Sequence, residues 1–230
     1  MNRHITRLPS IALALLLALS LAACLEKETS SIVYVEADGS VTWTILESGV
    51  HSDSADPDAA RREERDYLAE HRAGWTELAK ALAAMGGLDI QAHVLRDRAP
   101  FETHTSARFD GLEVWSNGYC AARRWPCTSQ TAREGAQTTW TWTIAGGATG
   151  SDQADEVDGV MAPLDEALVG LRVRLAAGRF VSARGFQLAG AVATLDSDAW
   201  EGDQDEYTLS LTWTRDTYST LTSTSPRFAF

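Results

Sequence analysis

The stretch Ile32–Leu46, IVYVEADGSVTWTIL, decides the fold of this chain. Its two halves, Ile32–Val35 and Val41–Leu46, are rich in β-branched and aromatic residues, which are enriched in strands. Asp38-Gly39 lies between them, and Asp-Gly between two such runs is typical of a tight hairpin turn. In the second half, large apolar residues alternate with threonine, so one face of that strand is expected to be buried. The stretch therefore predicts two antiparallel strands of a half-buried sheet.

A helix that could cover this sheet is expected at residues 57–85. Asp56 and Pro57 are typical of a helix start, and Gly86-Gly87 is typical of a helix end. Between these signals the large side chains recur at steps of three and four residues, at Tyr67, Leu68, His71, Trp75, Leu78, Leu82 and Met85. This spacing predicts one long amphipathic helix, with Gly74 as the place of any bend, whose stripe packs against the sheet.

A second hairpin is expected from Leu88–Arg96 and Phe101–Phe109. A turn centred on residues 98 and 99 places Asp89 opposite Arg108 and His93 opposite His104, and the opposite charges of the first pair support this register. Further strands are expected at residues 137–145, 171–175, 180–188, 191–195 and 207–214. Residues 110–136 are expected to form an irregular loop with at most a short helix near 112–115.

These segments predict an α+β domain, in which an antiparallel sheet of about 7–10 strands carries one long amphipathic helix on its apolar face. The hydrophobic content of 44% and the eight tryptophans are sufficient for a packed core. We expect this single domain at residues 31–217, after a polar tether at residues 24–30. Residues 218–230 are rich in Ser and Thr and are expected to form a loosely ordered tail.

The first 23 residues have the features of a secretory signal. A short basic start containing Arg3 and Arg7 precedes an apolar run at residues 11–23 that is too short to span a bilayer. The run ends in Leu21-Ala22-Ala23 followed by Cys24, and this exit resembles the lipobox of bacterial lipoproteins. The alternative is an ordinary signal peptide followed by a cysteine by chance.

The resemblance to lipoproteins implies where the protein works. It implies that residues 1–23 are removed and that Cys24 is lipidated and becomes the new N-terminus. In lipoproteins of two-membrane bacteria an Asp after the cysteine tends to retain the protein in the inner membrane, and this chain has Leu25 there. The expectation is therefore a cell-envelope protein anchored in the outer membrane and facing the periplasm.

The charge of the chain limits its partners. The full chain has a formal charge of −12, and residues 1–23 contain two of the 20 basic residues and none of the 32 acidic ones, so residues 24–230 carry −14. A surface this acidic repels nucleic acid and anionic lipid headgroups. We expect no nucleic-acid partner, and we expect the membrane to be bound through acyl chains rather than through charge.

The three cysteines fit an oxidising compartment. If lipidation consumes Cys24, then Cys120 and Cys127 remain as an even pair, which favours a disulfide. The alternative is two separate buried thiols. A metal site at these two cysteines is less favoured because the nearest histidine in the sequence is His104.

Other candidate sites have simpler explanations. His93 and His104 could bind a metal with Glu102, or could be two polar residues on a solvated sheet face. The acidic stretches at residues 152–158 and 196–206 do not have the ligand spacing of an EF-hand, so solvated turns are favoured over calcium sites. We therefore expect no metal and no cofactor.

A candidate binding site lies between the two late cysteines. Arg123, Arg124 and Trp125 combine basic and aromatic side chains, which are frequent at interaction hot spots, although the tryptophan could equally pack into the domain. The sequence contains no Gly-x-Ser-x-Gly, phosphate-loop or His-Glu-x-x-His motif, so no catalytic residue is predicted.

The leading hypothesis is a non-catalytic envelope module that binds a protein or an apolar ligand, or acts in assembly. The alternative is an enzyme that acts on a periplasmic or surface polymer. A tryptophan-lined cavity between helix and sheet would favour ligand binding, and a buried paired carboxylate or histidine in a cleft would favour an enzyme.

Overall fold

The computed structural model describes residues 25–145, 155–196 and 206–214, and Cys24 lies outside these ranges. Strands β1 (Leu25–Val35) and β2 (Val41–Ser52) form the predicted first hairpin, paired from Val35 and Val41 at the turn to Leu25 and Ser52 at the far end. The residues expected to form a tether, 25–30, are the first half of β1. The strand therefore begins directly after the position of the proposed anchor.

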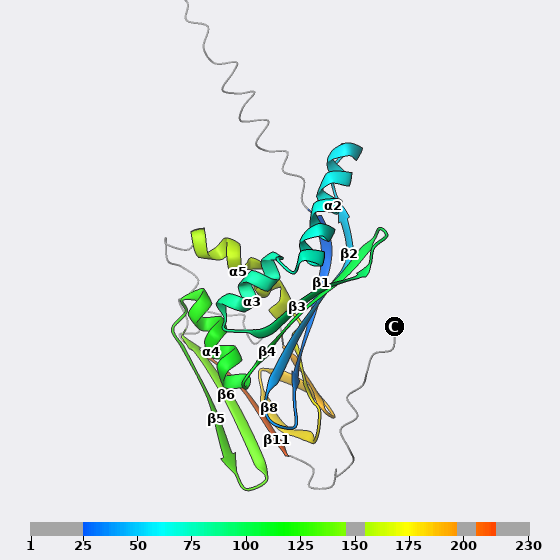
Figure 1. The fold of residues 1–230 in the computed structure, drawn as a ribbon. Helices are drawn as coiled ribbons and strands as arrows, with labels where there is room; N and C mark the ends of the chain where they lie inside the picture. Colours follow the sequence, from blue (N-terminus) through cyan, green and yellow to red (C-terminus); the bar gives the residue numbers. More distant parts are fainter. Residues whose placement is uncertain (1–24, 146–154, 197–205, 215–230) are drawn as a thin grey trace, which may run out of the picture.

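Within the described residues the strands form two sheets, and the expectation of one sheet was wrong (Figure 1). Sheet A has seven strands in the order β3-β4-β2-β1-β7-β10-β9, and sheet B has four in the order β5-β6-β11-β8. The other strands of sheet A are β3 (Leu88–Arg96), β4 (Phe101–Phe109), β7 (Arg172–Leu175), β9 (Phe186–Ala189) and β10 (Val192–Leu195). The strands of sheet B are β5 (Cys127–Glu134), β6 (Gln137–Ala145), β8 (Arg179–Arg184) and β11 (Glu206–Thr214).

The chain passes from one sheet to the other at a glycine. The expected strand at residues 180–188 is two strands, because Gly185 takes a positive φ of 74° between β8 in sheet B and β9 in sheet A. Sheet A is also not wholly antiparallel, since β7 lies parallel to β1, with Ile32 opposite Arg172. Neither feature follows from the local pattern of apolar residues.

The described helices are α2 (Pro57–Ala73), α3 (Glu77–Ala84), α4 (Leu112–Arg123) and α5 (Asp155–Leu168). The expected single helix over residues 57–85 was wrong, because two capping signals divide it. Gly74 ends α2 in the left-handed region with φ 73°, and the Thr76 side chain accepts a hydrogen bond from the Ala79 amide to start α3. Trp75 lies in the connection and is 71% exposed, so it is not a core residue. None of the helices in the described ranges has the length and apolar character needed to cross a membrane.

The segment at residues 110–136 is ordered as α4 and β5, and the expectation of an irregular loop was wrong. Asn117 and Gly118 both lie inside α4. Gly118 is needed there because a Cβ at this position would lie 2.1 Å from the Met85 carbonyl oxygen. The glycine thus marks a close approach of backbones rather than a turn.

The second hairpin has the predicted boundaries, and its register agrees from Gln91 to Val94, but beyond a bulge Leu88 rather than Asp89 lies opposite Arg108. β3 and β4 have the expected ends, and His93 lies opposite His104. The Arg108 guanidinium makes the expected ion pair with Asp89 at 3.0 Å, although a bulge at Leu88–Gln91 gives Asp89 a φ of 51°. Local pairing between neighbouring strands was therefore readable from the sequence.

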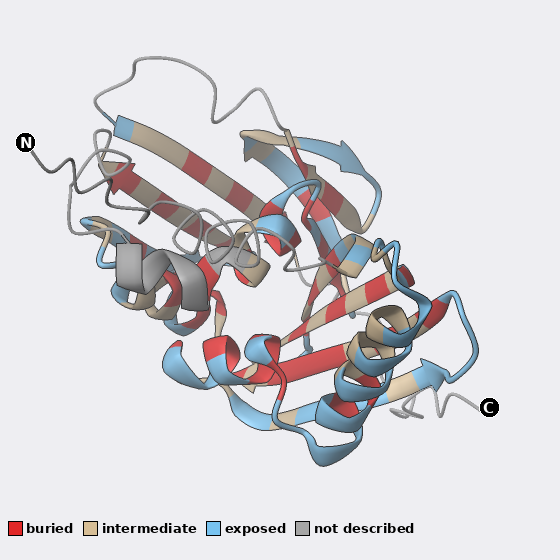
Figure 2. Cartoon of the chain, turned by 90° about the horizontal axis from the view of Figure 1, so that it is seen from above, coloured by how far each residue is buried: buried red, intermediate tan, exposed pale blue. Residues whose placement is uncertain are grey.

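One aromatic core fills the space between the two sheets and the helices. Along most strands buried residues alternate with half-buried or exposed ones (Figure 2), and most of the buried apolar ones belong to this core. The largest fully buried side chains are Trp43 of β2, Trp115 and Tyr119 of α4, and Trp140 and Trp142 of β6. Because these rings pack against one another, the tryptophans form the core rather than the lining of a ligand cavity.

Candidate functional site

A buried charged cluster lies between α2 and sheet A. It consists of Glu47 on β2, Lys27 on β1, Thr103 on β4, and Tyr67 and His71 on α2, and is called the Glu47 cluster below. Glu47 is 3% exposed and continues the inward-facing series of Trp43 and Ile45. Alternation along β2 would place an apolar residue here, so a carboxylate at this position needs partners.

The partners of Glu47 surround both carboxylate oxygens. Lys27 donates from Nζ to Oε1 at 2.5 Å, and the Tyr67 hydroxyl donates to Oε2 at 3.0 Å. Thr103 donates to the same Oε2 at 3.3 Å. The His71 Nε2 atom lies 3.4 Å from Oε2 without hydrogen-bond geometry to any described residue, while its Nδ1 lies 3.0 Å from the Tyr67 carbonyl oxygen. The cluster therefore ties α2 to three neighbouring strands.

The electrostatics of the cluster favour an ionised carboxylate. Burial would raise the pKa of Glu47, but the contact with His71 and the charge of Lys27 outweigh it and lower the pKa to about 2. Burial, followed by the nearby Glu47 charge, raises the pKa of Tyr67 well above its ordinary value, which keeps its hydroxyl protonated as a donor. The cluster is thus a stable set of charges at neutral pH.

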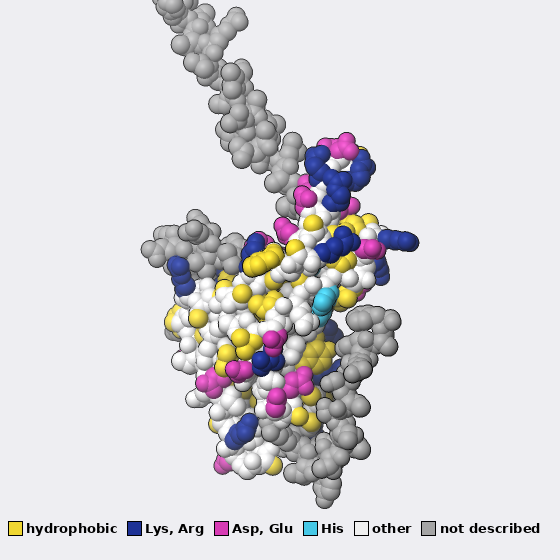
Figure 3. Space-filling model, viewed as in Figure 1, with side chains coloured by type: hydrophobic (Ala, Val, Ile, Leu, Met, Phe, Trp, Pro, Cys, Tyr) yellow, Lys and Arg dark blue, Asp and Glu magenta, His cyan; other side chains and the backbone are white. Residues whose placement is uncertain are grey.

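The position of the cluster suits a structural role better than a catalytic one. The cluster reaches solvent at the side chain of Lys27, which is 24% exposed. A neighbouring open hollow of about 560 Å³ is lined by Arg72, Asp97 and residues 92–95, and includes no member of the cluster. The outward side of α2 carries mixed basic and acidic residues (Figure 3), and Leu68 is its only buried apolar side chain. The helix is therefore held to the sheet both by the polar contacts of Glu47 and by a small apolar cluster in which Leu68 packs with Val50 and Phe101.

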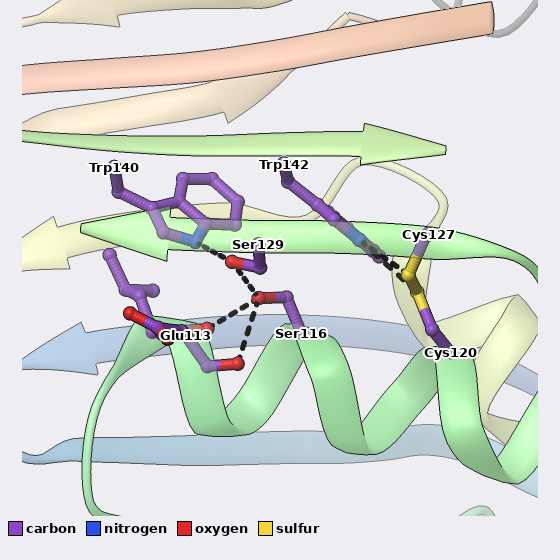
Figure 4. Close-up of a disulfide and its surroundings, with 8 residues drawn as sticks. Glu113, Ser116, Cys120, Cys127, Ser129, Trp140 and Trp142 are labelled. Carbon is purple, nitrogen blue, oxygen red and sulfur yellow. Dashed lines mark hydrogen bonds between the residues drawn. A yellow bond between two sulfur atoms is a disulfide. The ribbon is translucent and has the colours of Figure 1, made fainter. Parts of the chain in front are cut away.

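The expected disulfide is present between Cys120 and Cys127. It joins the end of α4 to the start of β5, and the Trp142 indole N–H points to the two sulfur atoms at 3.2 and 3.4 Å (Figure 4). Next to it, the Ser129 hydroxyl accepts from the Trp140 indole N–H at 2.8 Å and from the Ser116 hydroxyl at 2.7 Å. These contacts satisfy the indole N–H groups of Trp140 and Trp142 and fix α4 against sheet B, whereas the buried indole N–H groups of Trp43 and Trp115 have no hydrogen-bond partner among the described residues.

The residues of the basic aromatic segment lie at the end of α4. Arg123 pairs with Asp165 of α5 and lies over the Trp125 ring at 5.4 Å, while Trp125 packs edge-on against Tyr119. Arg124 is exposed and takes the left-handed conformation that ends the helix. Arg123 and Trp125 are thus engaged within the domain, and a binding role for the three residues remains a prediction.

The two histidines of the second hairpin lie side by side, and the described part of the chain gives them no third metal ligand. The rings of His93 and His104 stack with centroids 6.2 Å apart, and Glu102 is paired with Arg96 instead. Burial and the nearby His93 lower the pKa of His104. Among the residues that the structure describes, no group of three His, Cys, Asp or Glu side chains could hold a metal ion. Residues 152–154 and 197–205 of the acidic stretches lie outside the described ranges.

The outer face of sheet A, the face turned away from the aromatic core, is a feature that the sequence analysis did not identify. Register places Ile32 and Tyr34 of β1 between the threonines of β2 and two arginines of β7. Two rows of side chains cross this face, namely Ser106, Thr44, Ile32 and Arg172 in one, and Arg108, Thr42, Tyr34 and Arg174 in the other. In the sequence, the alternation of arginine with apolar residues in β7 could have indicated an exposed basic face. Only the pairing of β7 with β1 places these arginines beside Ile32 and Tyr34.

Comparisons with known proteins identify no family. No protein-family model matches the chain, and no curated protein matches it. The folded domain of LppM from Mycobacterium tuberculosis, determined by NMR, aligns over 83% of this chain and 91% of that domain, with 12% identity and a TM-score of 0.36. A TM-score this low does not establish a shared fold, so the function has to be argued from the residues of this chain.

Proposed function

We propose that this protein is a lipid-anchored cell-envelope protein whose domain is a non-catalytic binding or assembly module. The proposal assigns the anchor to Cys24 and places the protein in the outer membrane, facing the periplasm. The lipobox-like exit supports the anchor, and Leu25 after the cysteine supports the sorting. The supporting structural fact is that Leu25 already belongs to β1. A domain joined to its anchor in this way stays close to the membrane surface.

The observation that carries the binding role is the contrast between the two faces of sheet A. The inner face is covered by α2, α3 and α5 and by the aromatic core, which includes four fully buried tryptophans on β2, α4 and β6. The outer face carries half-buried Ile32 and Tyr34 and exposed Arg172 and Arg174. Because the aromatic rings in the described part of the core pack against one another, a partner is expected at the surface.

Substitution of the anchor residue tests the proposal. In a two-membrane bacterium, Cys24→Ser should remove palmitate labelling and move the protein out of the membrane fraction, whereas Cys120→Ser should leave labelling unchanged. Leu25→Asp should keep the label and shift the protein to the inner-membrane fraction. Full retention of Cys24→Ser in the membrane fraction would contradict the anchor.

A second candidate function is an enzyme acting on an envelope polymer, and the Glu47 cluster is the observation that favours it. A buried carboxylate beside His71, Lys27 and Tyr67 is the residue set of general acid–base chemistry. Turnover of an envelope polymer by purified protein, lost in a folded Glu47→Gln variant, would favour the enzyme over the binding module. Equal absence of turnover in both proteins favours the binding module.

A further inference from the structure

The centre of the outer face of sheet A combines an aromatic ring, hydroxyl groups and basic side chains. Tyr34 on β1 lies opposite Thr42 of β2 on one side and opposite Arg174 of β7 on the other. One step along the strands, Ile32 lies opposite Thr44 and Arg172. Directly opposite side chains on adjacent strands are close neighbours, so these six residues form one continuous patch.

The two arginines of this patch are available to a ligand. Arg172 and Arg174 are exposed, and neither makes an ion pair with a residue in the described ranges. Arg108, at the other end of the Tyr34 row, is held by Asp89 at 3.0 Å and Asp110 at 3.1 Å. Because Arg172 and Arg174 are two residues apart on one strand, their side chains project from the same face, with their Cα atoms roughly 7 Å apart. Such a pair fits two neighbouring anionic groups.

We propose that this patch binds an anionic glycan, with Arg172 and Arg174 on its carboxylate or phosphate groups and Tyr34 against a sugar ring. The inference rests on the proposed function as a surface-binding envelope module and adds the chemistry of the ligand. The flat apolar side of a sugar ring packs on an aromatic ring, and its hydroxyls match Thr42 and Thr44. The patch is positively charged and the ligand is negatively charged. This basic patch stands out because residues 24–230 carry a net charge of −14.

Other occupants fit the patch less well. An extended peptide pairs with a free sheet edge, which here is β3 or β9, whereas the patch is at the centre of the sheet. A flat anionic membrane would also meet Glu26 and Glu28, which lie on the same side of β1 between the anchor position and the arginines. A glycan chain can contact the arginines locally and avoid these carboxylates.

Binding of a labelled oligogalacturonate to the full-length chain in detergent tests the inference, with fluorescence anisotropy as the readout and uncharged dextran for comparison. Wild type should bind the oligogalacturonate, more weakly as salt rises, and should not bind dextran. The double variant Arg172→Gln/Arg174→Gln should weaken binding about tenfold or more, and Tyr34→Leu about fivefold. The matched control Arg179→Gln/Arg184→Gln, on exposed positions of β8, should bind as wild type does.

Several results would overturn the glycan site. These are an absence of wild-type binding at low salt, equal losses in the β8 control variant, or tighter binding of poly-L-glutamate, which would indicate an acidic polypeptide partner. Membrane fractionation of the same variants separates this inference from the proposed function. A protein that depends on Cys24 for membrane retention but binds no anionic glycan keeps the proposed function and loses the glycan site.

Discussion

Glu47 is a buried residue with an ionised carboxylate. Its ionisation should make the stability of the fold depend on pH. Its pKa is lowered from 4.5 to about 2, so the folded protein binds this proton less readily than the unfolded chain does. The resulting stabilisation is fully present above about pH 4.5 and is lost as pH falls toward 2. Glu47→Gln should therefore cost about 3 kcal/mol at pH 7 and much less near pH 2.

Urea unfolding of wild type and Glu47→Gln at pH 7 and pH 2 measures this difference. Glu77→Gln is the matched control, because Glu77 pairs with Lys80 on the exposed side of α3 and its loss should leave stability unchanged. An equal deficit of Glu47→Gln at both pH values would show that its charge is not what stabilises the fold.

At the scale of single elements, α4 depends on a glycine that the helix itself would not favour. Gly→Ala inside an exposed helix ordinarily stabilises by about 1 kcal/mol. At Gly118 the added Cβ would lie 2.1 Å from the Met85 carbonyl oxygen, so α4 would have to move away from the end of α3. Gly118→Ala should destabilise the protein by about 1–3 kcal/mol. Thermal unfolding checks this, with Asn117→Ala as the control that should not be destabilised.

The disulfide between Cys120 and Cys127 stabilises the junction of α4 and β5. Closing this loop of eight residues limits the unfolded chain and should contribute about 2.5 kcal/mol in the chain-entropy account. The double variant Cys120→Ser/Cys127→Ser should lose about that much in denaturant unfolding. Alkylation without reduction, followed by intact-mass measurement, should modify neither cysteine in protein purified from the envelope. Two modified thiols would contradict the bond.

At the scale of the whole molecule, the two sheets should unfold together. The core that joins them contains Trp43 of sheet A, Trp140 and Trp142 of sheet B, and Trp115 of the helix between them. We expect one transition in which tryptophan fluorescence and far-ultraviolet circular dichroism coincide. Two separate transitions would show that the sheets are independent units and would contradict the single domain predicted for residues 31–217.

Features set by neighbouring residues could be predicted from the sequence. Both hairpins have the predicted strands, because Asp38-Gly39 and the cross-strand pair of Asp89 and Arg108 act over a few residues. The pairing of Cys120 with Cys127 followed from their being the two cysteines left once Cys24 is assigned to lipidation in an oxidising compartment. The prediction of an α+β class was correct for the same reason, since strand and helix patterns differ in period.

What only the tertiary structure decided depends on contacts between distant segments. Three such features are the passage from β8 in sheet B to β9 in sheet A at Gly185, the close approach that requires Gly118 inside α4, and the partners that allow Glu47 to be buried. The patch of Tyr34 and Arg174 likewise exists only because β7 pairs with β1 across more than 130 residues of chain. Local pattern by itself determined the two hairpins and the α+β class. Packing decided the arrangement of the elements, because burial free energy depends on which surfaces meet and not on their order in the sequence.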